Sequence, residues 1–152
     1  NTVALLFTVI EYSSIAYIFW LEFKKKAFRI IIYVFSILFF ILTVLGMTYF
    51  NAFKDDISTT SEGIIIITLG ILYFLKIFND LDIPKLTNYY FFWLNSAFLL
   101  YFSTALFLFS FKSYIKTIDD QSVSNFLWGI HLIINIAYNI LLTIGICKHR
   151  KT

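Results

Sequence analysis

The sequence predicts an all-α polytopic membrane protein, a transmembrane helical bundle with five transmembrane helices. Of its 152 residues, 60% are apolar and 14% are charged, whereas roughly a quarter are charged in ordinary soluble domains. A soluble domain of about 150 residues buries about 70% of the surface that its unfolded chain exposes, so much of this apolar surface must face lipid or other proteins. Lipid offers the backbone no hydrogen-bond partners, so we expect each apolar run to be a helix.

A helix needs about 20 mostly apolar residues to cross about 30 Å of hydrocarbon, and five segments reach or approach that length. They make one transmembrane helical domain over residues 1–152, with helices at about 2–23, 28–50, 63–78, 89–111 and 124–147. Asn51 to Glu62 is polar and is predicted to be a loop, with Ser61 as the N-cap of the third helix. The only proline, Pro84, marks the next loop.

Lysine and arginine are distributed unevenly between alternate loops, and short cytoplasmic loops carry the excess of these residues. The larger group contains Lys24, Lys25, Lys26, Arg29, Lys85, Lys148, Arg150 and Lys151, and the smaller one contains Lys54, Lys112 and Lys116. This distribution predicts that the first helix runs from outside to inside and that the C-terminus is cytoplasmic.

Composition and motifs exclude several classes of function. The formal net charge is +3, but the cations lie at the ends of apolar runs, so we expect no nucleic-acid partner. Cys147 is the single cysteine and has no second thiol to pair with. His149 lies in the tail, so His131 has no second histidine in the membrane to hold a haem. Catalytic and phosphate-binding motifs are absent. The sequence therefore leans against an enzyme, and we expect no catalytic residue, metal or cofactor.

Glu11 lies about halfway along the first predicted helix. An ionisable group in hydrocarbon is costly, so it is a functional-site hypothesis by default. One interpretation makes Glu11 a proton-carrying or ligand-binding carboxyl. The other, which we favour, makes it a protonated or hydrogen-bonded side chain that holds helices together.

His131, Asn135 and Asn139 recur at every fourth position of the fifth predicted helix and form one polar stripe, which we expect to face the bundle. With the orientation given above, His131 and Asn135 lie at the depth of Glu11, and Asn95 of the fourth helix lies level with Asn139. The sequence thus predicts an intramembrane polar network of Glu11, His131 and Asn135, with Asn95 and Asn139 as a second pair, if these helices touch. Its default role is structural, because such hydrogen bonds average about 0.6 kcal/mol.

A cationic cluster lies between the first two predicted helices and consists of Lys24, Lys25, Lys26 and Arg29. Cations at a membrane surface attract anionic lipid head groups, at about 1 kcal/mol per residue. As determinants of topology they need no such role, and both interpretations stay open. Trp20, at the inner end of the first helix, is expected to be an interfacial anchor.

Two stretches, Leu69 to Lys76 (LGILYFLK) and Asn88 to Phe109 (NYYFFWLNSAFLLYFSTALFLF), resemble a family of uncharacterised multi-span inner-membrane proteins of Bacteroidota. The shared elements are a Tyr-Phe pair, a Phe-Trp helix and a closing Leu-Tyr-Phe-Ser, here Tyr73 with Phe74, Phe92 with Trp93, and Leu100 to Ser103. The resemblance implies a bacterial source and two further helices upstream, seven in all. It implies no activity. Residue 1 is Asn, so we expect the chain to belong to a longer polypeptide.

The leading function hypothesis is a non-enzymatic protein of the bacterial inner membrane that acts through helix contacts, as a sensory module or an accessory subunit of a membrane complex. Its expected partners are the lipid bilayer and other membrane subunits or a signalling protein. The alternative is a small-molecule or proton-handling carrier, or a quinone-site protein, that uses Glu11, His131 and Asn135. A closed bundle favours the first hypothesis and a polar cavity favours the second.

Overall fold

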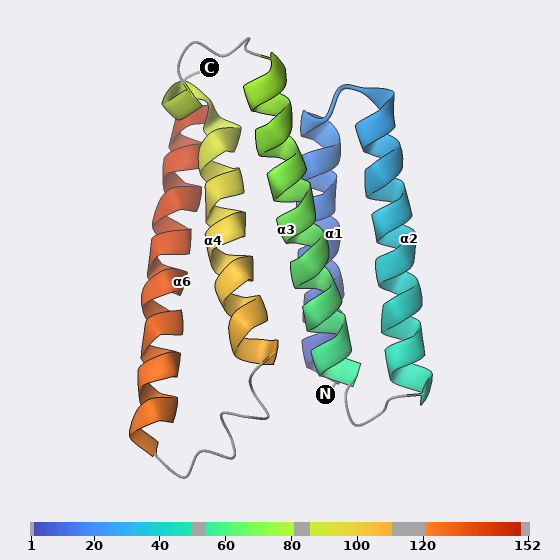
Figure 1. Ribbon diagram of the computed structural model, residues 1–152, viewed down its shortest axis with the longest axis vertical. Coiled ribbons are helices and arrows are strands. Elements are labelled where there is room, and N and C mark those ends of the chain that lie inside the picture. Colours follow the sequence, from blue (N-terminus) through green and yellow to red (C-terminus); the bar gives the residue numbers. More distant parts are fainter. Residues whose placement is uncertain (1, 50–53, 81–85, 111–120, 150–152) are drawn as a thin grey trace. The chain divides into compact units, whose positions relative to one another are not determined.

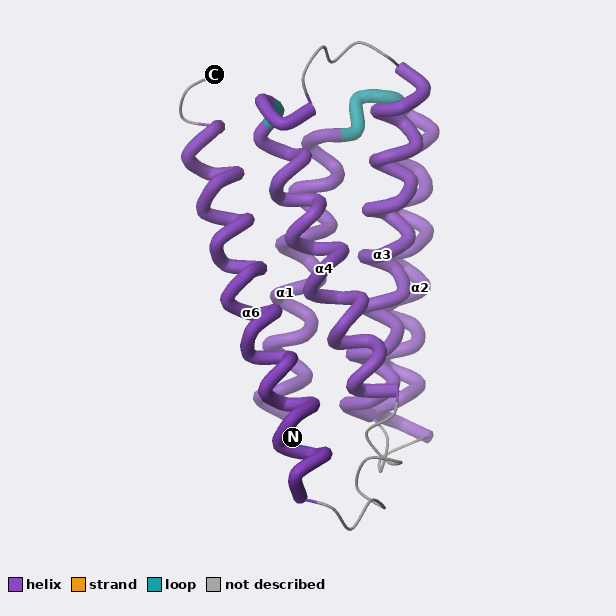
Figure 2. The backbone as a smooth tube through the Cα atoms, turned by 60° about the vertical axis from the view of Figure 1, so that its left-hand side comes forward, coloured by secondary structure: helices purple, strands orange, loops and turns teal. Residues whose placement is uncertain are grey.

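A computed structural model describes residues 2–49, 54–80, 86–110 and 121–149. Helix makes up nearly all of this described backbone (Figure 1, Figure 2). The elements are α1 (Thr2–Glu22), α2 (Lys26–Tyr49), α3 (Lys54–Asp80), the 3₁₀ turn η1 (Leu86–Asn88), α4 (Tyr90–Ser110) and α6 (Gln121–His149). The prediction of an all-α fold is confirmed.

Each of the five α-helices in the described ranges contains a stretch long and apolar enough to cross a membrane. These stretches are Leu5–Glu22, Lys26–Gly46, Ile57–Asn79, Tyr90–Leu108 and Asn125–His149. The architecture is therefore that of a polytopic membrane protein. Several residues used to predict orientation and loops lie outside the described residues, namely Pro84, Lys85, Lys112, Lys116, Arg150 and Lys151.

The predicted start of the third helix is wrong. α3 begins at Lys54 instead of Gly63, so residues 54–62 are helical and do not form a loop. Ser61 is not an N-cap: it lies inside α3, where its Oγ donates to the Ser58 carbonyl oxygen over 2.9 Å. The physical reason is burial, because Ser58, Ser61 and Glu62 occupy the buried face that Ile65 and Leu69 continue.

The chain divides into two compact units within α3. Unit 1, Asn1–Leu69, contains α1, α2 and the first part of α3, and unit 2, Gly70–Thr152, contains the rest of α3 with α4 and α6.

Aromatic side chains form much of the core of unit 1. Phe19, Phe23 and Phe39 are fully buried, and Tyr12 is almost so. The Tyr12 and Phe39 rings stack with their centroids 4.0 Å apart, which joins α1 to α2. Phe23 stacks on Phe28 at 4.7 Å, where the chain turns from α1 into α2. The same type of contact therefore holds these two helices together at their connecting turn and about halfway along their length.

Unit 2 is built on close packing of α4 against α6, which lie side by side (Figure 1, Figure 2). Gly145 permits the approach, since a Cβ atom there would lie 2.0 Å from Leu94 Cδ1. Tyr101 stacks on Tyr138 with centroids 4.7 Å apart. Small residues let membrane helices approach closely enough for dispersion and hydrogen bonds to hold them, and α4 and α6 follow that rule.

Candidate functional site

Unit 1 contains a buried group of polar side chains contributed by α1, α2 and α3. The Tyr12 hydroxyl of α1 shares a hydrogen bond with Ser36 Oγ of α2 over 3.1 Å. Thr43 Oγ1 of α2 shares one with Ser58 Oγ of α3 over 3.3 Å. These bonds satisfy hydroxyl groups that would be costly to leave unpaired in hydrocarbon. The buried residues of this group are Thr8, Tyr12, Thr43, Ser58, Ser61 and Glu62.

Glu62 is the most unusual member of this group. Its side chain is 2% exposed and lies within the candidate span Ile57–Asn79 of α3. Its Oε1 atom is buried and has no hydrogen-bond partner among the residues that the structure describes. Buried polar groups are nearly always hydrogen-bonded, and a buried charge without a partner is costly. Such an exception makes Glu62 a candidate for a functional role.

The second carboxyl of the site belongs to Glu11 of α1, which is partly buried. The carboxyl groups of Glu11 and Glu62 lie close enough to interact electrostatically. Glu11 comes six residues after Leu5, the start of its candidate span, and Glu62 comes five residues after Ile57, the start of its own. At 1.5 Å per residue these positions are about 9 Å and about 8 Å along the helices. Successive spans alternate in direction, so the first and third spans run the same way across the membrane. The two carboxyls therefore lie at similar depths.

The described surroundings of this carboxyl pair are polar. The Tyr12 hydroxyl also interacts electrostatically with Glu62. Within the described parts of the chain, no lysine or arginine forms an ion pair with either carboxyl. Nor do the described residues bring together three or more His, Cys, Asp or Glu side chains that could hold a metal ion. Two carboxyls without a counter-ion resist simultaneous ionisation, so the simplest species that they can bind is a proton.

Sequence reasoning found Glu11 but missed Glu62, because the polar stretch before Gly63 was interpreted as a loop. One signal in the sequence could have found it. Ser58, Glu62, Ile66, Leu69 and Tyr73 follow one another at helical spacing, and all are buried. Extending the apolar stripe of α3 backwards in this way places Glu62 on the buried face.

The other predicted network residues, Asn95, His131, Asn135 and Asn139, belong to unit 2, whereas Glu11 belongs to unit 1. Asn139 Nδ2 donates to the carbonyl oxygen and to Oδ1 of Asn135, over 2.8 Å and 2.9 Å. Asn95 is fully buried and donates instead to the Gly70 carbonyl oxygen of α3 over 3.0 Å. The structure thus brings together Asn135 and Asn139 on one helix, while the network with Glu11 stays a prediction.

His131 lies beside aromatic rings of unit 2. Its ring centroid is 5.9 Å from that of Tyr101 and 6.0 Å from that of Trp128. His131 Nδ1 is buried and lacks a hydrogen-bond partner within the described ranges. The geometry favours aromatic packing as the role of this histidine.

Part of the predicted polar stripe of α6 lies on an exposed face. Asn139 and Thr143 are exposed, and with three isoleucines they line a shallow groove of about 390 Å³. An exposed amide in a candidate span is costly in lipid, which cannot hydrogen-bond to it. This face of α6 therefore differs from the uniformly apolar surface expected of a lipid-facing helix.

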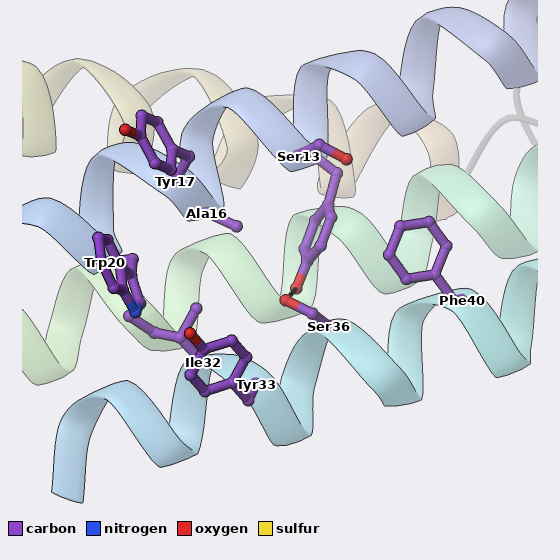
Figure 3. A pocket seen from close by; sticks show the side chains of 9 residues that line it. Ser13, Ala16, Tyr17, Trp20, Ile32, Tyr33, Ser36 and Phe40 are labelled. Atoms are coloured by element: carbon purple, nitrogen blue, oxygen red, sulfur yellow. Dashed lines mark hydrogen bonds between the residues drawn. The ribbon is translucent and has the colours of Figure 1, made fainter. Parts of the chain in front are cut away.

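A second groove, of about 380 Å³, runs between α1 and α2 of unit 1 (Figure 3). Trp20, one of its lining residues, is covered by the guanidinium group of Arg29, whose Cζ lies 4.4 Å from the ring centroid. Arg29 Nε also donates to the Phe23 carbonyl oxygen over 2.8 Å. The predicted cationic cluster is thus adjacent to this groove, and its members Lys24, Lys25 and Lys26 are exposed.

Comparisons of this chain with protein-family models, with curated proteins and with solved structures found no match.

Proposed function

We propose that this chain is a proton-handling membrane protein in which Glu11 and Glu62 share one proton. The observation that supports the proposal is the burial of Glu62, with one carboxyl oxygen unpartnered among the described residues, within electrostatic reach of a second carboxyl. Acidic residues within membrane spans commonly pair with one another and mark proton relays in pumps and transporters. The proposal keeps the proton-handling hypothesis for Glu11 and gives Glu11 a new partner.

The chemistry of the pair follows from electrostatics. Ionising one carboxyl disfavours ionisation of the other, because like charges repel strongly where the surroundings screen them weakly. The pair then alternates between a form with one shared proton and a form in which both carboxyls are neutral. The Tyr12 hydroxyl interacts electrostatically with Glu62, and Ser58 and Ser61 are buried in the same unit, so hydroxyl groups are available there to hydrogen-bond to these states.

Proton flux into vesicles tests this function. The purified protein is reconstituted with a pH-sensitive dye inside, and a potassium diffusion potential drives protons across the membrane. We expect Glu62→Gln and Glu11→Gln each to lower the flux at least tenfold, because the amide keeps the shape but cannot exchange the proton. Glu22→Gln, at the C-terminal end of α1, is the matched control and should stay within twofold of wild type. Unchanged flux in Glu62→Gln, or wild-type flux no higher than that of empty vesicles, would contradict the proposal.

A second function, as a subunit that acts through helix contacts with a partner chain, is favoured by a separate observation. Asn139 and Thr143 are exposed on α6. The Asn139 Nδ2 atom bonds to Asn135 within the helix, and a polar residue on a partner helix would supply further hydrogen bonds that lipid cannot. Such a subunit would be a sensory module or an accessory part of a membrane complex. Extraction in mild detergent and mass spectrometry of the copurifying proteins tests it, and a stoichiometric partner is the expected result.

We further propose that the protein resides in a bacterial inner membrane with its C-terminus in the cytoplasm. The excess of lysine and arginine near one set of helix ends supports this topology. A cysteine-specific, membrane-impermeant label applied to intact cells tests it in a Cys147→Ser, Thr152→Cys variant, because Thr152 follows the candidate span Asn125–His149 in the sequence. Labelling only after the membrane is permeabilised is expected, and labelling of intact cells would reverse the proposed orientation.

A further inference from the structure

The α1–α2 groove differs from an ordinary lipid-facing surface because its two ends differ in character. Figure 3 shows Tyr17, Trp20 and Tyr33 gathered at one end and Phe40 at the other. Its volume of about 380 Å³ falls within the range of small-molecule pockets, about 300–1,000 Å³. The groove is open on one side and lined mainly by apolar and aromatic groups, so its occupant must have an apolar portion.

The aromatic end of the groove coincides with a concentration of positive charge. The candidate span of α1 ends at Glu22 and that of α2 begins at Lys26, so this turn lies at the membrane boundary. Arg29 lies over the Trp20 ring at 4.4 Å, with Lys24 and Lys26 exposed on the same turn. An arginine whose Nε is already fixed by the Phe23 carbonyl oxygen still has terminal N–H groups in a planar array suited to phosphate oxygens.

We propose that the α1–α2 groove binds an anionic phospholipid, with one acyl chain in the groove and the phosphate group against Arg29 and Lys26. The apolar walls of the groove match the acyl chain, and the cations at the membrane boundary match the phosphate group. The Tyr17 and Tyr33 hydroxyls lie at the same end (Figure 3) and add hydrogen-bonding groups for the head group. The inference does not depend on the Glu11–Glu62 pair.

Trp20 provides a direct probe of this site. In a Trp93→Phe, Trp128→Phe background it is the remaining tryptophan of the chain. The protein is reconstituted in phosphatidylcholine vesicles that contain a fixed fraction of lipid brominated on an acyl chain, carried either by phosphatidylglycerol or by phosphatidylcholine. Bromine quenches tryptophan fluorescence on contact. We expect the relative binding constant obtained from quenching to favour phosphatidylglycerol at least threefold.

Three variants separate the parts of the site. Lys24→Gln with Lys26→Gln removes two exposed cations and should bring the preference to about one, and Arg29→Gln should do the same. Ser13→Phe places a ring in the groove without changing a charge, because Ser13 is exposed and lines the groove. It should also abolish the preference. Lys76→Gln, a charge change on α3, is the matched control and should keep it.

Two outcomes overturn the proposal. Equal quenching by the two brominated lipids in the wild-type protein would mean that only unselected surrounding lipid contacts Trp20. A preference that survives in Ser13→Phe would mean that the cations attract head groups without use of the groove. Circular dichroism and gel filtration of each variant establish that the compared proteins are folded.

Discussion

Asn95 of α4 donates a hydrogen bond from its Nδ2 atom to the Gly70 carbonyl oxygen of α3 over 3.0 Å. Asn95 is fully buried, so the bond forms inside unit 2. Gly70 makes the approach possible, because a Cβ atom there would lie 2.8 Å from Leu99 Cδ2 and 3.0 Å from Asn95 Oδ1. A small residue on one helix thus permits a side-chain bond from the next, the usual way of joining membrane helices.

Gly70→Ala should therefore lower the free energy of unfolding by about 1–3 kcal/mol, the usual range for overpacking a close contact. The added methyl group must push Leu99 away and lengthen the Asn95 bond. Unfolding in a detergent titration, followed by circular dichroism, measures the change. Ser96→Ala is the control, since the Ser96 Oγ atom donates within its own helix to the Phe92 carbonyl oxygen, and it should change stability by less than about 0.6 kcal/mol. Wild-type stability of Gly70→Ala would contradict the role assigned to this glycine.

Two glycines of α6 allow a comparison within one helix. A Cβ at Gly145 would lie 2.0 Å from Leu94 Cδ1 and 3.2 Å from the Tyr90 carbonyl oxygen, whereas a Cβ at Gly129 would meet nothing within 4 Å. Gly145→Ala should separate α4 from α6 and destabilise the protein by about 1–3 kcal/mol or more. Gly129→Ala should be neutral or stabilising, by up to about 1 kcal/mol, because alanine is the better helix former. Equal thermal stability of the two variants would refute the proposed packing.

The bond between Tyr12 and Ser36 can be isolated by a double-mutant cycle. Tyr12→Phe removes the hydroxyl but keeps the ring that stacks on Phe39. We expect a coupling energy with Ser36→Ala of about 0.6 kcal/mol, the average for hydrogen bonds between membrane helices. If detergent unfolding shows that the effects of the two substitutions are additive, the coupling energy is zero and the bond between the two hydroxyls does not stabilise the protein.

The exposed side-chain amide of Asn139 on α6 allows the proposed binding of a partner protein to be tested. Asn139→Leu removes the group that a partner helix would bind and leaves an apolar surface suited to lipid. Recovery of a copurifying membrane protein should fall several-fold, as measured by quantitative mass spectrometry. Ile136 lines the same groove. Ile136→Leu changes the shape of this side chain but not its polarity, and it should leave recovery unchanged. A partner recovered equally with Asn139→Leu would not be bound through this face.

Much of the fold could be predicted from the sequence because hydropathy alone marks membrane spans. The first helix, predicted at about 2–23, is Thr2–Glu22, and the fourth, predicted at about 89–111, is Tyr90–Ser110. Both have abrupt changes from apolar to polar residues at their ends. α3 does not, since Ser58, Ser61 and Glu62 in its first turns are polar and lie on a face that is buried. Hydropathy averages over all faces of a helix and so places the start of α3 too late.

The candidate site was harder to predict because it depends on which helices are neighbours. Glu11 stands out as an acid within an apolar run, but depth alone matches it with His131 and Asn135, because the sequence assigns Glu62 to a loop outside the third predicted helix. Asn95 was matched with Asn139 on depth alone, whereas in the structure it bonds to the backbone of Gly70. Every residue has a backbone carbonyl oxygen whatever its side chain, so a sequence cannot show which one accepts a hydrogen bond.

Infrared spectroscopy of the protein in lipid bilayers tests the shared proton most directly. The carbonyl stretch of a protonated carboxyl is separate from the bands of a carboxylate. We predict a band of this kind at neutral pH that weakens as the pH rises, that is lost or shifted in Glu62→Gln and Glu11→Gln, and that persists in Glu22→Gln. A wild-type spectrum without a protonated carboxyl at neutral pH, or a band that both Gln variants leave unchanged, would contradict the assignment of Glu11 and Glu62 as a proton-sharing pair.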